Sequence, residues 1–185
     1  MVRAFDLSRP QSSGKGIATA LRTAGSWVGI GGGGSVEGVP MIDSMVEEDV
    51  ASVVPNNPNG GYVFDVGEED ITVVGLRVYA PLAEINTITL WDDNTQALLA
   101  SVDVDALVDQ WVEGAIDPVV LTAAARYRVA SYGNSTVDRN RISVSGNVTF
   151  NPLITYVTGC WGSKDAFPGD NSSGWLNGIT DLAAG

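Results

Sequence analysis

From Tyr62 onward, apolar residues in this sequence recur at every second position, in short runs that end at turn-forming residues. In the run 72–79, for example, Val74 and Leu76 would share one face of a strand. The runs expected to form strands are residues 61–65, 72–79, 86–91, 97–104, 111–116, 118–121, 126–132 and 141–150. Strands this short and frequent predict an all-β fold, an antiparallel β-sandwich of jelly-roll-like form. Residues 103–111 also fit a helical turn by their periodicity.

The first 60 residues differ from the rest, because turn-forming and glycine-rich stretches replace the alternating runs. Glycine dominates residues 29–35, where it gives the backbone maximal freedom and offers no side chain to pack. Residues 17–24 fit one or two helical turns. We therefore predict an extended glycine-rich N-terminal arm over residues 1–60 and a sandwich domain over residues 61–185. The residues expected to anchor the arm on neighbouring subunits are Ile17, Leu21, Trp27 and Ile30.

Charge and missing residue types narrow the possible functions. The chain has 22 acidic and 10 basic residues and a formal net charge of −12. Nucleic-acid binding relies on clustered lysine and arginine, so we expect no nucleic-acid partner. Histidine is absent, which removes the commonest general base and the commonest catalytic metal ligand. The single cysteine, Cys160, cannot form an internal disulfide, and we expect it to be a small buried residue.

Targeting signals are also missing from the sequence. No uncharged apolar run reaches the roughly 18 residues that a membrane-spanning helix needs, so no membrane insertion is expected. The first residues carry Arg3, Asp6 and Arg9 and lack the apolar stretch of a secretory signal. This pattern favours a chain that stays in the cytoplasm or leaves it within a particle released by lysis.

Several short motifs follow one another between residues 61 and 180. Residues 73–79 contain a glycine followed by an apolar-Arg-apolar-aromatic run, and residues 88–91 end in tryptophan. Residues 122–132 contain a threonine and then the sequence Val-Ala-Ser-Tyr. The remaining motifs are residues 97–100, 110–111, 151–153, 166–168 and 171–175. In this order they resemble an uncharacterised β-sandwich family found in bacterial surface proteins and in glycosidase-associated modules.

The resemblance implies a β-sandwich whose architecture is similar to that of carbohydrate-binding modules. It implies no activity, because the family has none assigned. The family usually occurs as one module of a secreted multidomain chain, unlike the arm-and-sandwich layout predicted here. Its members also commonly carry a histidine after the Ser-Tyr pair, where this sequence has Gly133, so any role of that histidine is lost.

The aromatic residues offer the main candidate binding site. Exposed aromatic rings stack on sugar rings, and Trp161 and Trp175 flank a polar loop. With Tyr132 they form the predicted glycan platform, although each could instead fill the core. For Trp91 and Trp111 we expect core packing.

Acidic residues suggest weaker alternatives. The loop 162–174 offers Asp165, Asp170 and Asn171 as oxygen donors for calcium, but ordinary turn chemistry explains them as well. Two acidic triplets, residues 47–49 and 68–70, could supply the paired carboxylates of a glycosidase, although such triplets are usually solvated. We therefore predict no catalytic residues, no metal and no cofactor.

Together these features lead to two functional hypotheses of different classes. The first is a non-enzymatic structural component of a virus particle, such as a head-decoration, spike, fibre or tail accessory protein of a tailed bacteriophage. Its partners would be other virion proteins and copies of itself, and its location would be the virion. The alternative is a carbohydrate-binding or adhesin module that recognises surface glycans at the cell surface or outside the cell.

Overall fold

The structure is a computed structural model, and it describes residues 38–53, 59–133 and 139–185. The predicted anchors Ile17, Leu21, Trp27 and Ile30 and the predicted helical turns of residues 17–24 lie outside these ranges. The regular secondary structure of the described chain is β-strand, apart from one short 3-10 turn, η1 (Glu47–Asp49). The strands are β1 (Val39–Pro40), β2 (Ile42–Met45), β3 (Ala51–Val53), β4 (Asn59–Val66), β5 (Ile71–Tyr79), β6 (Ile85–Asp92), β7 (Leu98–Asp105), β8 (Trp111–Leu121), β9 (Arg126–Gly133), β10 (Arg139–Ser143), β11 (Val148–Phe150), β12 (Ile154–Gly162), β13 (Asp170–Ser172), β14 (Trp175–Leu176) and β15 (Ile179–Ala184).

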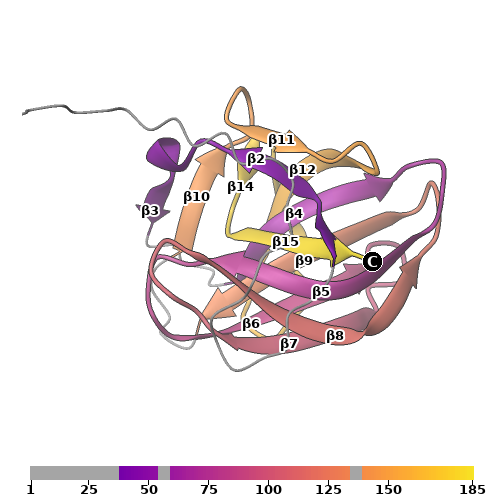
Figure 1. The fold of residues 1–185 in the computed structure, drawn as a ribbon, viewed down its shortest axis with the longest axis horizontal. Helices are drawn as coiled ribbons and strands as arrows, with labels where there is room; N and C mark the ends of the chain where they lie inside the picture. The colour runs from indigo at the N-terminus through magenta and orange to yellow at the C-terminus, as the bar shows by residue number, and fades with distance from the viewer. Residues whose placement is uncertain (1–37, 54–58, 134–138) are drawn as a thin grey trace, which may run out of the picture.

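Two larger sheets form the sandwich (Figure 1). One has the strand order β13-β12-β4-β9-β6-β7 and the other has the order β1-β15-β5-β8. Two smaller sheets, β14-β10-β3 and β11-β2, lie in the upper part of the same view. Neighbouring strands in all four sheets pair in antiparallel fashion across the described residues. The all-β, antiparallel sandwich class expected from the sequence is therefore confirmed.

Three local expectations need correction. Residues 111–116 and 118–121 form one continuous strand, β8, because its pairing with β5 absorbs an irregularity near Val73. Residues 141–150 form two strands, β10 and β11, which are separated by a turn where Gly146 has a φ of 80°. The helical turn expected over residues 103–111 is wrong, because residues 103–105 extend β7 along β6, residues 106–110 form a connection and Trp111 begins β8.

The sandwich begins earlier than the sequence suggested. β1 pairs with β15, β2 with β11 and β3 with β10, so residues 39–53 belong to the sandwich and not to an arm that precedes it. The side chains of Met41 and Ile42 are 0% and 3% exposed and join the main hydrophobic cluster. The acidic turn η1 interrupts residues 39–53, so each alternation of apolar and polar residues there is too short to indicate a strand.

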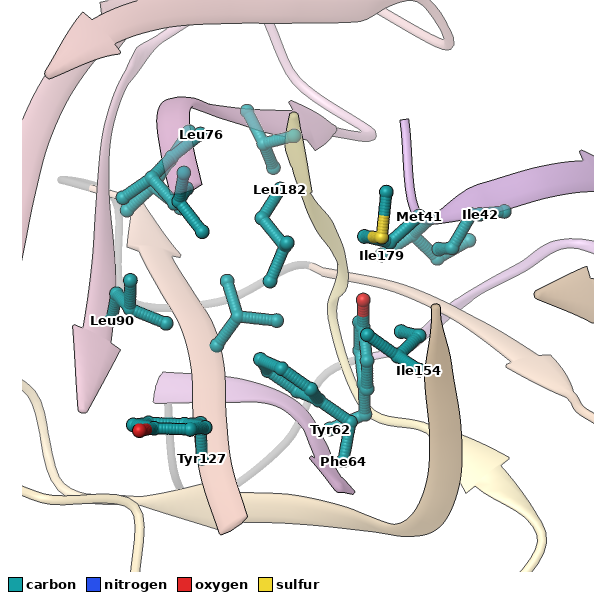
Figure 2. Packing of buried hydrophobic residues seen from close by; sticks show 14 of the residues in the cluster. Met41, Ile42, Tyr62, Phe64, Leu76, Leu90, Tyr127, Ile154, Ile179 and Leu182 are labelled. Carbon is teal, nitrogen blue, oxygen red and sulfur yellow. The ribbon is translucent and has the colours of Figure 1, made fainter. Parts of the chain in front are cut away.

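The core lies between the two larger sheets. Tyr62 and Phe64 are fully buried, and Figure 2 shows them in one cluster with Leu76, Leu90 and Leu182. The two sheets are linked at one edge by β7, whose Val102 and Val104 side chains pack against Gly114 of β8. A Cβ atom at Gly114 would lie 2.6 Å from a methyl group of Val102, so only glycine lets the two strands approach this closely.

Candidate functional site

The three residues of the predicted glycan platform do not lie on one face. In the six-stranded sheet Trp161 lies opposite Gly60, and Gly60 lies opposite Ser131. Tyr132 is the next residue of β9, and neighbouring residues of a strand point to opposite faces. Tyr132 and Trp161 therefore emerge on opposite sides of this sheet. The predicted three-residue platform is not assembled.

The loop of residues 163–169 folds over the face that carries Tyr132. Lys164 Nζ lies 5.5 Å from the centroid of the Tyr132 ring, and the Asn59 amide donates to the Ala166 carbonyl at 2.9 Å. Burial raises the pKa of the Tyr132 hydroxyl, and a hydrogen bond with Asp165 raises it further. Tyr132 is only 9% exposed, so this face offers no open aromatic surface at its position.

A buried arginine fastens the same loop to the sheet. Arg128, which is 7% exposed, donates to the Pro168 carbonyl at 2.6 Å, forms an ion pair with Asp93 and lies 4.7 Å from the Phe167 ring. Phe167 in turn packs edge-on against Trp91 at 5.9 Å. Because Trp91 lies opposite Arg128 in the sheet register, it belongs to this outer face, and the core position expected for Trp91 is wrong.

Trp111 occupies the expected environment. It is partly buried and packs against the main hydrophobic cluster. Its ring contacts Tyr79 edge-on at 5.7 Å, and the Arg77 guanidinium lies 4.2 Å from its centroid. Core packing of Trp111 is thus confirmed.

Trp175 lies on β14, beside β10, and is 36% exposed. The Arg141 guanidinium lies 3.7 Å from the centroid of the Trp175 ring. The Tyr156 hydroxyl donates to the Trp175 carbonyl at 3.1 Å, and this hydrogen bond holds the backbone of β14 in place. Trp175 is therefore a held, partly exposed aromatic ring with a cation stacked on it.

Trp161 comes to the same corner of the molecule as Trp175. A Cβ atom at Gly159 would lie 2.0 Å from the Trp175 carbonyl oxygen, so β12 and β14 almost touch there. Trp161 follows two residues later on the same strand face. Its register partner Gly60 lies against Arg139, because a Cβ atom at Gly60 would be 2.1 Å from Arg139 Nη1. Two of the three predicted platform residues therefore share a neighbourhood.

We call this neighbourhood the arginine–tryptophan site, consisting of Arg139, Arg141, Trp161 and Trp175. Arg139 and Arg141 are two residues apart on β10 and so point to one face, whereas Ile142 of the same strand points to the other face and is fully buried in the core. Neither arginine is among the site residues predicted from the sequence. An Arg-x-Arg pattern within a strand would have indicated two cations on one face.

The two arginines of this site lack an acidic partner among the described residues. Arg139 Nη1 donates to the Asn59 carbonyl at 3.0 Å, but the Nε atoms of Arg139 and Arg141 are buried without a hydrogen-bond partner. Burial lowers the pKa of the Arg139 guanidinium to about 10, and the Arg141 charge acts in the same direction. Two uncompensated cations are thus crowded beside two tryptophans.

The calcium and glycosidase alternatives gain nothing from the geometry. Asn171 Oδ1 accepts a hydrogen bond from Arg128 at 3.1 Å and is therefore occupied. Within residues 38–53, 59–133 and 139–185, no group of three potential metal-binding side chains comes together. Of the acidic triplets, Glu47–Asp49 forms the exposed turn η1, and Asp70 accepts a hydrogen bond from the Ala123 amide at 2.7 Å.

Cys160 has the buried position that the sequence indicated. It is 0% exposed and packs with Val63 and Ala130 on the outer face of the large sheet. Burial raises the pKa of its thiol to about 12. The thiolate, which is the nucleophile and metal ligand, is therefore strongly disfavoured.

A cavity of about 290 Å³ opens beside β10, where Asn140 points to the face opposite Arg139 and Arg141. It is lined by Glu47, Val50, Tyr79, Pro81, Leu82, Asp109 and Asn140. The Asn140 amide donates to the Tyr79 carbonyl and to Asp109 Oδ1, both at 3.2 Å. Burial raises the pKa of the Tyr79 hydroxyl, and the charges of Glu47 and Asp109 raise it further.

Comparison with known proteins adds no identification, since no family model matches this chain and no curated protein matches it. The family resemblance noted in the sequence therefore stays a prediction. In the part of the chain that the structure describes, no helix has the length and apolar character needed to cross a membrane.

Proposed function

We propose that this chain is a non-enzymatic structural component of a virus particle, such as a decoration, spike, fibre or tail accessory protein. Residues 1–37 would join the sandwich of one copy to that of a neighbouring copy. The observation that carries this proposal is the unequal distribution of charge between these two parts of the chain.

Residues 1–37 are basic and the sandwich is strongly acidic. The first segment holds four of the 10 basic residues, Arg3, Arg9, Lys15 and Arg22, but only two of the 22 acidic ones. Residues 38–185 hold the other six basic and 20 acidic residues. A segment and a domain of opposite charge attract one another across subunits, and like-charged sandwiches stay soluble when displayed densely.

The sandwich surface also has an apolar patch that fits such a contact. We define the end patch as Leu82, Ile85, Leu107 and Val108, which are 36%, 44%, 41% and 49% exposed. Two backbone hydrogen bonds, from the Ala106 amide to the Glu84 carbonyl and from the Asp109 amide to the Ala80 carbonyl, hold the two loops together at 2.9 Å.

The end patch adjoins the cavity that contains Glu47 and Asp109. Apolar surface next to carboxylates suits a segment that combines Ile17, Leu21, Trp27 and Ile30 with four basic residues. This complementarity supports residues 1–37 of a second copy as the occupant.

Light-scattering mass of the full chain and of a chain beginning at Gly38 tests the self-association. We expect an oligomer for the full chain, a monomer for the shortened chain and weaker association at roughly 1 M salt than at roughly 0.05 M. Leu107→Asp should reduce the mass of the full chain. The matched control Val120→Asp, at a residue that is 61% exposed on β8, should not.

A full chain that is monomeric at both salt concentrations overturns the assembly role. An oligomer that persists after removal of residues 1–37 overturns the role of that segment. Mass spectrometry tests the assignment to a virus particle. Virus particles purified from cultures that produce this chain should contain the protein.

A second candidate function is the binding of surface glycans. The approach of Trp161 and Trp175 to one corner favours it, because two aromatic rings beside polar side chains can hold a sugar. A glycan array with the full chain and with Trp175→Ala tests this function. Binding that the substitution leaves unchanged would count against this site.

A further inference from the structure

The six basic residues of the sandwich differ in their partners. Arg77, Arg126 and Arg128 each form an ion pair with an aspartate, and Lys164 lies over the Tyr132 ring. Arg139 and Arg141 form none with any residue that the structure describes. In a sandwich with 20 acidic residues, two neighbouring arginines without a carboxylate partner are unexpected.

The lack of an acidic partner for Arg139 and Arg141 among the described residues costs folding stability. A charge that is withdrawn from water needs an opposite charge or a full set of hydrogen bonds, and each of these guanidinium groups leaves its buried Nε unpaired. Burial and the neighbouring Arg141 charge both lower the pKa of Arg139. Partly buried charged groups with a perturbed pKa cluster at functional sites.

The donor geometry suits a carboxylate. A guanidinium group offers two parallel N–H donors that match the two oxygens of a carboxylate, and Arg141 is already oriented by stacking at 3.7 Å on Trp175. The Arg139 side chain is held by its hydrogen bond to the Asn59 carbonyl. Both donors are therefore preorganised, which reduces the entropy lost on binding.

The neighbouring rings suit a sugar. Trp175 is 36% exposed, and Trp161 emerges on the sheet face that Arg139 covers. Carboxylate-matching donors and aromatic rings occur together here on the described surface.

We infer that the arginine–tryptophan site binds an acidic saccharide, with the sugar carboxylate on Arg139 and Arg141 and the sugar ring against Trp175. This inference rests on the second candidate function, glycan binding, and names its ligand class. It is independent of the assembly role of residues 1–37.

Isothermal titration of the full chain with matched probes tests the inference. The probes are sialyllactose against lactose, and hexagalacturonate against maltohexaose, so that each acidic saccharide has a neutral counterpart. We expect binding of at least one acidic probe and at least tenfold weaker binding of its neutral counterpart. Arg141→Gln should weaken acidic binding at least tenfold, and Arg141→Lys should also weaken it, since lysine lacks the planar donor fork.

Arg126→Gln is the matched control, because Arg126 is also on a strand but pairs with the exposed Asp65. It should leave binding unchanged, and thermal melting should show that each variant is folded. Equal binding of acidic and neutral probes, lost in Trp175→Ala, overturns the carboxylate assignment and leaves glycan binding intact. No binding of any probe overturns both. In a further outcome, the unsubstituted chain binds no saccharide and Arg141→Gln has a lower oligomer mass than that chain. This result identifies a protein carboxylate as the partner and also overturns the inference.

Discussion

Arg77 and Asp181 lie opposite each other on β5 and β15, and their side chains form an ion pair that is almost completely buried, with exposures of 7% and 0%. Arg77 Nε and Nη2 donate to Asp181 Oδ2 at 2.9 and 2.6 Å. The same oxygen accepts from the Ile42 amide, and Oδ1 accepts from the Tyr62 hydroxyl, both at 2.9 Å. One carboxylate thus connects the two larger sheets to the N-terminal strands.

Replacement of Asp181 by asparagine should destabilise the fold strongly. It removes the charge that compensates buried Arg77, which typically costs about 3–5 kcal/mol. Urea denaturation measures the loss of unfolding free energy. The control is Asp65→Asn, whose partner Arg126 is 47% exposed, and it should cost less than about 1 kcal/mol. Similar losses for the two variants would show that burial of the Arg77 pair is not the cause.

Glu113→Gln should stabilise the protein at neutral pH. Glu113 lies opposite Arg77 in the register of β8 and β5, and its Oε1 atom is buried without a hydrogen-bond partner. Burial raises the pKa of its carboxyl above the ordinary value of 4.5, and the Arg77 charge offsets this only in part.

A raised pKa in the folded state means that the neutral form of Glu113 is favoured by folding. Its stabilising contribution is therefore complete below about pH 4.5 and is lost as the pH rises through the folded-state pKa. Melting temperatures from pH 4 to pH 8 should show the variant gaining over the unsubstituted protein as the pH rises. An advantage that is the same at every pH would contradict this account.

Chains shortened at the N-terminus should show which residues the sandwich needs for its stability. A chain that begins at Gly38 retains β1, β2 and β3 and should unfold cooperatively near the melting temperature of the full chain. A chain that begins at Tyr62 lacks Met41 and Ile42, whose loss should cost about 5 kcal/mol or more, a large part of the stability of an ordinary domain. Calorimetry measures both. Equal melting of the two chains would refute the role of residues 39–53 in the core.

Cys160 should be unreactive in the native protein. Its thiol is 0% exposed, and burial raises its pKa to about 12, so both access and thiolate are lacking at pH 8. Ellman's reagent should label no cysteine under native conditions and about one per chain in concentrated urea. Rapid labelling of the native chain would show that the outer face near Val63 is open to solvent.

Local pattern was sufficient for much of this protein. Alternation predicted the segments that form β4 to β11, and the apolar run around Cys160 predicted its burial. It did not predict β12 and β15, which lie inside the two larger sheets. Local pattern failed for residues 39–53, because strands of two to four residues contain too few alternations to be distinguished from turns. The sequence also predicted a core position for Trp91. That prediction failed because Phe167 of the loop 163–169 covers the outer face of the sheet, so an apolar ring can pack there as well.

The arginine–tryptophan site shows most clearly what the sequence could not provide. The sequence by itself determined the strand period, the acidic charge and the absence of histidine, because these depend only on neighbouring residues and composition. Only the tertiary structure decided that Trp161 and Trp175 lie near two arginines that have no acidic partner among the described residues, while Tyr132 lies on the opposite face. The reason is physical: sheet register, set by pairing between distant segments, determines which side chains share a face, and a shift of one residue reverses it.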